Sequence, residues 1–376
     1  MSLEEIAQSC GFDFVKALEE GSFGRVMVVK KRDGSSGAPG VVEPTVMKVV
    51  KKPRADKELN IHKLLGSHDN IIHFLESFEI RDTDLGLQLE MMTDDLHSLI
   101  HNKDTPFPRS LVKPFFRQMV KGLEHMHSLK IAHLDVKPEN MFVTGDRLKI
   151  GDFGLSLCVK KSNGSGLHRV WGGSGTDPYR SPQLCFPNFR ADAFPCDVWA
   201  LGLVLIYMMA KDVPWNCSRI IDPKYKKWVD RKLDSRGTVR WNRMSENLID
   251  LLRKMLSHHS AQRATLDDVK EHSWLLGNDD EEEHVEIVAK ENKVQKKNKK
   301  RAVAPSPPDN IENEEASERD ESQGPSNQIL LPDQRLKRNR MPTEESIQPT
   351  EQQSPEDCSG RGKRVRQSKR QFELLY

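Results

Sequence analysis

The sequence lacks any pairing among its cysteines. Six are present, and no two form a C-x-x-C pair or repeat at a regular spacing: Cys10, Cys158, Cys185, Cys196, Cys217 and Cys358. A disulfide framework or a structural zinc site requires cysteines at short, repeated spacings, so we expect neither. Solitary cysteines are typical of a protein in a reducing compartment.

Long hydrophobic runs are also missing. The longest, Val198–Ala210, is shorter than the roughly 20 residues that a membrane-spanning helix needs, so it predicts a buried core helix. The first residues, Met1–Gly11, include Glu4 and Glu5 in place of the basic and apolar segments of a secretory signal. We therefore expect a soluble, intracellular chain without a membrane partner.

A strong charge of one sign is lacking as well. The formal net charge is +2 and the isoelectric point lies near 8.1, so overall electrostatics favour neither nucleic acid nor an anionic membrane as a partner. The basic runs near the C-terminus are separated by acidic residues and contain no aromatic residues for base stacking. We therefore predict no direct nucleic-acid partner.

Aromatic residues nearly vanish toward the end of the sequence. The segment 277–376 contains an acidic run at 279–283 and basic runs at 293–301, 335–340 and 361–370. With so few apolar side chains it cannot bury a core, so we predict a disordered, charged tail. The basic runs fit nuclear import signals and equally a merely solvated tail, and both interpretations stay open. We expect the protein in the nucleus and the cytoplasm.

Ahead of this tail the pattern changes from strands to helices. β-Branched runs at Val26–Val29 and Thr45–Val50 predict strands joined by glycine-rich turns. Apolar residues at helical spacing predict helices at Glu58–Leu65 and Leu111–Ser128, with Leu89–Leu96 as a hinge between the two kinds of structure. We therefore predict the α+β class, with a small antiparallel β-rich lobe followed by a larger α-helical lobe.

A short turn with two glycines lies between two strand-like segments. Its residues are Gly21, Ser22, Phe23 and Gly24. Glycines let backbone N–H groups approach phosphate oxygens closely, so the turn is a candidate phosphate-binding loop. A tight hairpin explains the same residues, and the turn taken alone favours that simpler interpretation.

One lysine stands inside an apolar run. Lys48 lies within Val46–Val50, where an ammonium group without a partner is costly to bury. Glu58, on the next predicted helix, is a candidate partner. A lysine that extends to solvent beside a solvated glutamate explains the pair equally well.

The most informative stretch reads HLDVKPEN and is followed by a strand-like LKI and the triplet DFG. It supplies two carboxylates, an amide and a lysine at fixed spacing. Asp135 can accept the proton of an acceptor hydroxyl, and Lys137 can offset the charge of a moving phosphoryl group. Asn140 and Asp152 offer the oxygen atoms that magnesium prefers. Such an order predicts phosphoryl transfer.

With these residues, the chain over about 14–276 resembles the eukaryotic protein kinase superfamily. The resemblance implies that Lys48 binds the α- and β-phosphates of ATP and that Glu58 orients it. It also implies that Asp135 is the catalytic base, assisted by Lys137, and that Asn140 and Asp152 bind Mg²⁺. The positions that it assigns to ATP are Leu18, Glu19, Glu20, Gly21, Ser22, Phe23, Gly24, Val26, Lys48, Glu58, Glu90 and Met92.

The same resemblance implies a two-lobed arrangement. An extension at 1–13 precedes an N-lobe at 14–89, a hinge at 90–95 and a C-lobe at 96–276, with the disordered tail at 277–376. By the same resemblance, Leu89 is similar to the residue that lies behind the adenine ring of ATP in the family. Gly175 and Thr176 resemble the segment that positions the substrate peptide. Asp197 resembles the start of the following helix.

A finer resemblance rests on scattered residues of the C-lobe. Leu201–Trp215, Tyr225–Trp228, Trp241 and Arg263–Thr265 are similar to the calcium/calmodulin-dependent kinase group, and within it to the checkpoint kinase 1 family. Lys137 resembles the serine/threonine form of the catalytic loop. The resemblance implies a monomeric serine/threonine protein kinase with protein substrates, in cell-cycle or DNA-damage checkpoint signalling.

Three positions depart from the family pattern. Glu19 replaces a loop glycine, Leu134 replaces the arginine before the catalytic aspartate, and Gln183 replaces a glutamate expected to pair with Arg263. These departures motivate the alternative of a pseudokinase scaffold, which binds partners with little or no turnover. In an active enzyme, Glu139 and Asp95 would favour substrates with basic residues near the target.

Overall fold

A computed structural model of the chain describes most of the residues before the tail. The tail beyond Gly277, with its acidic and basic runs, and the loop residues Ser22 and Phe23 lie outside the described residues. Those described are 1–21, 24–32, 43–102, 107–159, 169–233 and 239–277.

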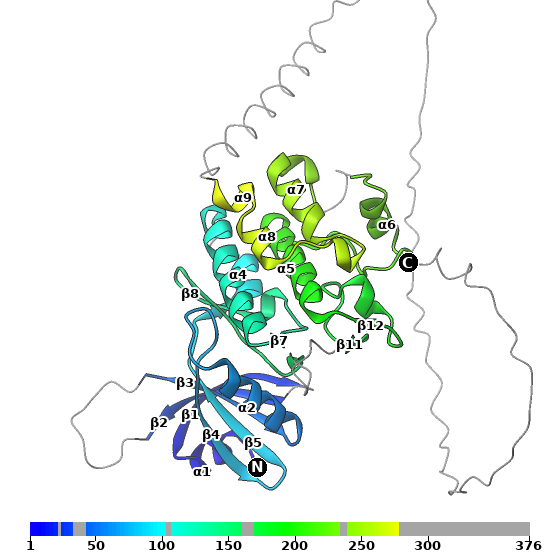
Figure 1. Ribbon diagram of the computed structural model, residues 1–376. Coiled ribbons are helices and arrows are strands. Elements are labelled where there is room, and N and C mark those ends of the chain that lie inside the picture. The colour runs from blue at the N-terminus through cyan, green and yellow to red at the C-terminus, as the bar shows by residue number, and fades with distance from the viewer. Residues whose placement is uncertain (22–23, 33–42, 103–106, 160–168, 234–238, 278–376) are drawn as a thin grey trace, which may run out of the picture. The chain divides into compact units, whose positions relative to one another are not determined.

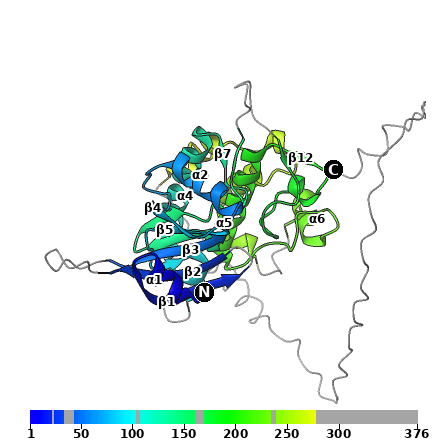
Figure 2. The same cartoon turned by 90° about the horizontal axis from the view of Figure 1, so that it is seen from below.

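The N-lobe is a five-stranded antiparallel sheet with one large helix. Its strands follow the order β1-β2-β3-β5-β4, and Figure 2 shows them side by side in that order. The β-branched runs form the strands β2 and β3, and the sequence predicts both as strands. The elements are β1 (Phe12–Gly21), β2 (Gly24–Lys31), β3 (Thr45–Lys51), β4 (Phe74–Arg81), β5 (Asp84–Leu89) and helix α2 (Arg54–Leu65).

The segment 1–13, expected as an extension, contributes a helix to this lobe. Helix α1 (Leu3–Ser9) begins at a capping box, in which Ser2 and Glu5 each bond to the other's backbone amide. Its apolar side buries Ile6 against the inner residues of β1 and β2, among them Phe12. The cluster closes one face of the sheet at its β1 edge.

The C-lobe is built around helix α5 (Ala193–Ala210). This helix is apolar on all sides and is long enough to span a bilayer, but 78% of its apolar stretch is buried within the lobe, as the run Val198–Ala210 predicts. Figure 1 shows other helices around it. They are α3 (Leu96–His101), α4 (Val112–Ser128), α6 (Pro223–Val229), α7 (Glu246–Met255), α8 (Leu266–Lys270) and α9 (Ser273–Leu276).

Short strands bring the two informative stretches of sequence together. Strand pairs β7–β10 and β8–β9 flank the loops 133–140 and 151–156, so both loops emerge at the same place. The short strands are β6 (Asp94–Asp95), β7 (Ile131–Ala132), β8 (Met141–Thr144), β9 (Arg147–Ile150), β10 (Leu157–Cys158), β11 (Val170–Trp171) and β12 (Arg190–Ala191). A small antiparallel β-rich lobe and a larger helical lobe confirm the predicted fold class.

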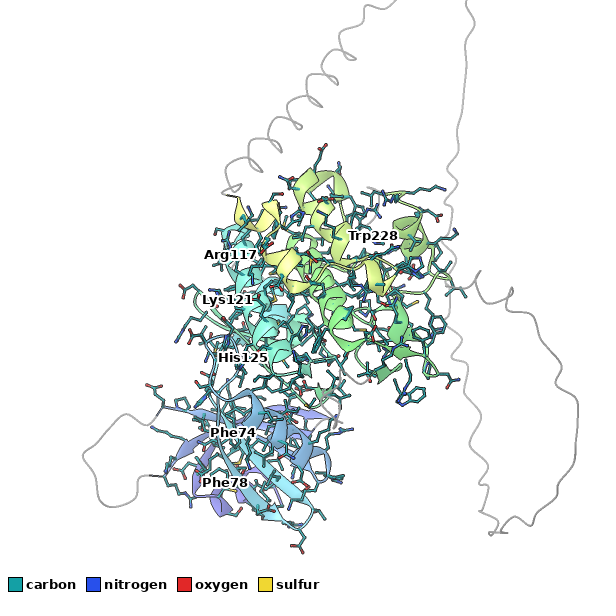
Figure 3. The ribbon with its side chains drawn as sticks, in the orientation of Figure 1. Phe74, Phe78, Arg117, Lys121, His125 and Trp228 are labelled. Carbon is teal, nitrogen blue, oxygen red and sulfur yellow. The ribbon has the colours of Figure 1, made fainter. Side chains whose placement is uncertain are left out.

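Helix α4 connects the lobes. Figure 3 labels Arg117, Lys121 and His125 along it. The imidazole Nε2 of His125 lies 2.7 Å from the carbonyl oxygen of Leu65, the last residue of α2. Arg117 donates to the carbonyl of Leu275 in α9. One helix thus holds both the N-lobe helix and the end of the C-lobe.

Gln183 takes part in a buried hydrogen-bond network. Its Oε1 accepts from Nη2 of Arg263 at 2.8 Å, and its Nε2 donates to the carbonyl of His258 at 2.6 Å. Arg263 also donates to the carbonyl of Pro195 at 2.7 Å. Burial lowers the pKa of Arg263 to about 10. The neutral amide therefore satisfies one donor and one acceptor at once.

We expect that Gln183→Glu does not stabilise the fold. The carboxylate would gain attraction to Arg263, but its second oxygen would face the His258 carbonyl without a hydrogen between them. These effects oppose each other, so the free energy of unfolding should change by less than about 1 kcal/mol, whereas Gln183→Ala should lose about 1–3 kcal/mol. Urea denaturation of both variants measures this. A gain above about 2 kcal/mol for Gln183→Glu would contradict the network described.

Candidate active site

Lys48 is held by two carboxylates. It lies at the centre of β3, paired with Val26 of β2 and Leu87 of β5. Its Nζ lies 2.7 Å from Oε1 of Glu58 and 2.8 Å from Oδ1 of Asp152, and only 9% of its side chain is exposed. The structure thus selects the ion pair over the solvent-directed lysine.

The charges of this trio reinforce one another. Burial lowers the pKa of Lys48, but the two carboxylates outweigh burial and raise it, so the ammonium stays charged. Burial likewise raises the pKa of Asp152, and the ammonium of Lys48 outweighs it and lowers that pKa. The second oxygen of Glu58 is buried without a partner among the described residues. Glu58 is therefore bound through one oxygen.

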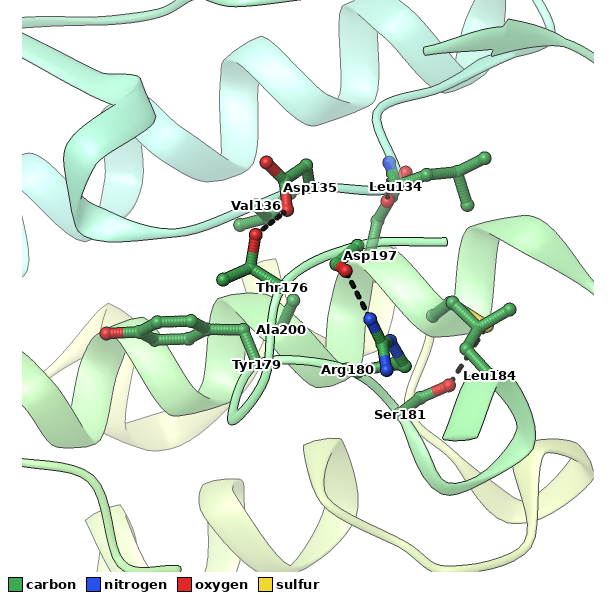
Figure 4. Close-up of a pocket in the computed structure, with 12 residues that line it drawn as sticks. Leu134, Asp135, Val136, Thr176, Tyr179, Arg180, Ser181, Leu184, Asp197 and Ala200 are labelled. Carbon is green, nitrogen blue, oxygen red and sulfur yellow. Dashed lines mark hydrogen bonds between the residues drawn. The ribbon is translucent and has the colours of Figure 1, made fainter. Parts of the chain in front are cut away.

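Asp135, Lys137 and Thr176 form a triangle of polar contacts. The hydroxyl of Thr176 donates to Oδ1 of Asp135 at 2.7 Å, as Figure 4 shows. Nζ of Lys137 lies 3.1 Å from Oδ2 of Asp135 and 3.2 Å from the Thr176 hydroxyl. Because Thr176 is 41 residues from Asp135, folding alone brings the triangle together. The three side chains present a carboxylate, a hydroxyl and an ammonium at one point.

Asn140 and Asp152 each keep an oxygen available for a metal ion. The amide nitrogen of Asn140 donates to the backbone carbonyl of Asp135 at 2.8 Å, which leaves the amide oxygen as its metal-binding atom. Oδ1 of Asp152 accepts from Lys48 at 2.8 Å and from the amide of Gly154 at 3.3 Å, which leaves Oδ2. Carboxylate and amide oxygens are the donors that Mg²⁺ prefers, so the set fits that ion.

Asp197 fixes the shape of the catalytic loop. Its carboxylate accepts the backbone amides of His133 and Leu134 at 2.9 and 2.8 Å, and it is 1% exposed. Leu134 has φ +66°, a conformation that a leucine adopts only when its surroundings enforce it. The sequence carries a signal for this role, because Asp197 is a carboxylate inside the most apolar helix of the chain.

The side chain of Leu134 packs into an apolar cluster. Its side chain is 5% exposed and belongs to a cluster of buried residues. The cluster comes from the segment between β10 and α5, which contains Thr176, and from the start of α5; among its members are Val170, Leu184 and Ala191. An arginine at this position would have to place its charge among the apolar side chains of this cluster. The segment that contains Thr176 is therefore attached to the catalytic loop by apolar packing as well as by the polar contacts of Thr176.

The glycine-containing turn connects β1 to β2. Gly24 has φ +130°, and a Cβ there would lie 2.5 Å from the carbonyl oxygen of Val49, so a larger residue does not fit. Glu19 pairs with Val26 across the hairpin, and the register shifts by one residue at Leu18. Leu18, Glu19 and Glu20 are exposed. The departure at Glu19 therefore leaves the strand pairing intact.

The predicted hinge presents free backbone groups at Met92. Glu90 is engaged, because its Oε1 accepts from Lys149 at 2.7 Å and from the amide of His73 at 2.6 Å. No backbone hydrogen bond of Met92 to another described residue is present. An adenine edge needs such a free amide and carbonyl. The contact between Glu90 and Lys149 joins residues 59 apart in the chain, so no local pattern predicted it.

Four rings form a row of tilted and edge-to-face contacts behind the ion pair. His62 contacts Phe74 of β4 and Phe153, with ring centres 5.7 and 4.9 Å apart, and Phe153 contacts His133 at 5.7 Å. Figure 3 labels Phe74 at the N-lobe end of this row. His133 in turn is bound to Asp197 through its backbone amide. The row connects the sheet to the core of the C-lobe.

His62 is a neutral ring in this row. It is 3% exposed, and its Nε2 has no hydrogen-bond partner among the described residues. Burial and then the nearby ammonium of Lys48 lower the pKa of His62 to about 3. Helical spacing alone marked it as one more inward position of α2, and nothing in the sequence predicted its ring contacts.

We predict that His62 makes the fold less stable in mild acid. As the pH falls below the ordinary pKa of 6.5, the unfolded chain binds a proton at this ring and the folded chain does not. The resulting loss should reach about 2 kcal/mol at pH 5. His62→Leu should remove it. Urea denaturation between pH 8 and pH 5 compares this variant with the exposed control His259→Gln, and an unchanged pH dependence in His62→Leu would contradict the prediction.

Comparison with known proteins agrees with this geometry. The protein kinase domain family matches residues 12–275. Serine/threonine-protein kinase chk-1 of Caenorhabditis briggsae is 28% identical over 272 residues, which are 70% of this chain and 53% of that protein. Serine/threonine-protein kinase grp of Drosophila melanogaster is 27% identical over 271 residues, 70% of this chain and 50% of that protein.

A third relative is matched over nearly its whole length. Testis-specific serine/threonine-protein kinase 3 of Homo sapiens is 29% identical over 285 residues, 73% of this chain and 99% of that protein. The chain spans about half the length of the chk-1 and grp proteins. The chain therefore belongs to the eukaryotic protein kinase superfamily, and within it is similar to the calcium/calmodulin-dependent group and to checkpoint kinase 1.

Proposed function

We propose that this chain is an active serine/threonine protein kinase that transfers the γ-phosphoryl group of ATP to a protein hydroxyl. The triangle of Asp135, Lys137 and Thr176 carries the proposal, because it places a proton acceptor and a cation at one point. The charged Lys48, fixed by two carboxylates, supplies the phosphate-binding group. A role in checkpoint signalling is the finer part of the proposal, supported by similarity to chk-1 and grp.

The reaction makes one bond and breaks one. The substrate hydroxyl oxygen bonds to the γ-phosphorus, the bond from that phosphorus to its bridging oxygen breaks, and ADP leaves. Asp135 accepts the hydroxyl proton, while Thr176 holds the carboxylate in orientation and Lys137 offsets the charge of the phosphoryl oxygens. Asn140 and Asp152 would hold magnesium, which supplies further charge neutralisation of the phosphates when bound.

The departures from the family pattern leave this constellation intact. Glu19 keeps its strand pairing, Gln183 keeps a hydrogen bond to Arg263, and Leu134 replaces charge with apolar packing. None of the three contacts Lys48 or displaces a member of the triangle. They give no support to a scaffold without turnover.

Asp135→Asn should abolish transfer while it preserves ATP binding. Asparagine keeps the size of the side chain but cannot accept the proton, so turnover should fall by at least about 100-fold. Transfer of labelled phosphate from ATP with magnesium to a serine peptide measures this. Asp192→Asn, an exposed aspartate elsewhere in the C-lobe, is the matched control. Unmodified protein that binds ATP without any transfer would overturn the proposal in favour of a scaffold.

Three acidic side chains lie near the hydroxyl of Tyr207, and one of them, Glu139, belongs to the loop that carries Asp135 and Asn140. Burial raises the pKa of Tyr207 to about 12, and Glu139, Asp212 and Asp95 add to the effect because their negative charges lie near its hydroxyl. Glu139 is exposed, whereas Asp95 also caps helix α3 through Ser98, with bonds of 2.9 and 2.7 Å. Glu139 and Asp212 are therefore the better candidates for binding a basic substrate residue.

We expect Glu139→Gln to weaken selection for arginine. A charge-assisted hydrogen bond contributes about 1.5–3 kcal/mol, so kcat/KM for peptides with arginine before the target should fall roughly tenfold or more. Neutral peptides should be nearly unaffected, and Glu271→Gln, a remote exposed glutamate, should change neither. A positional peptide array makes the comparison. Equal turnover of acidic and basic peptides by the unmodified protein would refute the preference itself.

A further inference from the structure

Three arginines line a cavity in the C-lobe, far along the chain from the catalytic residues. The cavity has a volume of about 170 Å³. Arg109 contributes from the short helix before α4, and Arg240 and Arg243 from the turn before α7, while Met209, Ala210 and Met244 supply the apolar part of the lining. A water molecule occupies about 30 Å³ in the liquid, so the cavity has room for carboxylate groups. We call it the arginine pocket.

Among the described residues, the guanidinium groups of these arginines have no acidic partner. All three residues are exposed, and within the described part of the chain none of their side chains forms an ion pair or a hydrogen bond. Three like charges around one cavity repel each other unless an anion lies between them. A guanidinium group presents a planar fork of donors that matches a carboxylate or phosphate. The pocket is therefore suited to a polyanion.

The described chain ends against helix α4, which begins three residues after Arg109. Nζ of Lys113, in the first turn of α4, donates to the carbonyl of Gly277 at 3.2 Å, and Arg117 donates to the carbonyl of Leu275. Figure 1 shows α9 against the first turns of α4. Arg109 precedes Lys113 by four residues, which is about one helical turn. The last described residue is thus held by the helix that directly follows one of the pocket arginines.

The sequence that follows has the matching charge. Asn278 is succeeded by five consecutive acidic residues, Asp279–Glu283. A chain can extend at most about 3.3–3.6 Å per residue, so these residues can lie no farther than roughly 7 to 20 Å from Gly277. The acidic run is therefore tethered closely to the lobe that contains the pocket.

We propose that the acidic run Asp279–Glu283 binds in the arginine pocket of its own chain. Its carboxylates pair with the guanidinium groups of Arg109, Arg240 and Arg243. A short flexible connection keeps a tethered group at an effective concentration in the millimolar range, which favours this occupant over the same chemistry in solution. The contact directs the start of the tail over the C-lobe, and it does not depend on catalytic activity.

A labelled peptide with the sequence of residues 278–284 tests this assignment. Fluorescence polarisation at low salt compares the intact chain with a neutral-run variant, Asp279→Asn, Asp280→Asn, Glu281→Gln, Glu282→Gln and Glu283→Gln. The neutral-run variant should bind the peptide, and the intact chain should bind it roughly tenfold more weakly, because its own run competes at millimolar effective concentration. Adding Arg109→Gln, Arg240→Gln and Arg243→Gln to the neutral-run variant should abolish binding.

A matched set of exposed arginines serves as the control. Arg81→Gln, Arg147→Gln and Arg231→Gln, added to the neutral-run variant, should leave peptide binding unchanged. Equal binding of the peptide by the intact and neutral-run proteins would show that the chain's own acidic run does not occupy the pocket. The pocket would then be assigned to an acidic segment of another molecule. Absence of binding to the neutral-run variant, or binding that survives loss of the three pocket arginines, would overturn the proposal.

Discussion

The ammonium of Lys48 is the point on which the arrangement of the site depends. It joins a strand of the sheet, helix α2 and the loop after β9, because Glu58 and Asp152 both bind the same Nζ, at 2.7 and 2.8 Å. Burying three ionised groups is costly unless their geometry is good, so the trio constrains how α2 can lie against the C-lobe. A shift of that helix away from β3 would leave a buried charge without its partner. The position of the N-lobe helix and the conformation of the loop after β9 are therefore coupled.

A second series of contacts supports the first. The ring of His62 on α2 continues through Phe153 to His133, and the backbone of His133 is held by Asp197 in α5. Phe153 adjoins Asp152, so ring packing and ion pairing act on neighbouring residues. Asp197 in α5 thus holds the catalytic loop in shape and also fixes His133, the last ring of the row. The ion pair of Asp152 and the ring contacts of Phe153 therefore act on adjacent residues of one loop.

Much of the fold and of the candidate site could be predicted from the sequence. The features that could not be predicted are mostly contacts between residues far apart along the chain. The strands, the helix of Glu58 and the lobe order follow from local periodicity, and a contiguous stretch revealed Asp135, Lys137 and Asn140. Lys48 and Glu58 remained ambiguous, because burial decides whether a lysine needs a partner. The bond between Thr176 and Asp135 spans 41 residues, and the ring contacts of His62 cross from helix to strand to loop. Helix α1 was missed because its apolar face consists of only a few residues.

The packing of Leu134 bears on how such an enzyme could be controlled. In the proposed function, part of the attachment between the peptide-positioning segment and the catalytic loop is made by apolar side chains around Leu134, beside the hydrogen bond of Thr176 to Asp135. A phosphate has no charge to pair with in that apolar part, whereas it makes or breaks an arginine–phosphate pair. In the proposed enzyme, this apolar part of the attachment would form with the fold itself. A phosphate that regulates the site would then have to act through charged residues other than the one at position 134.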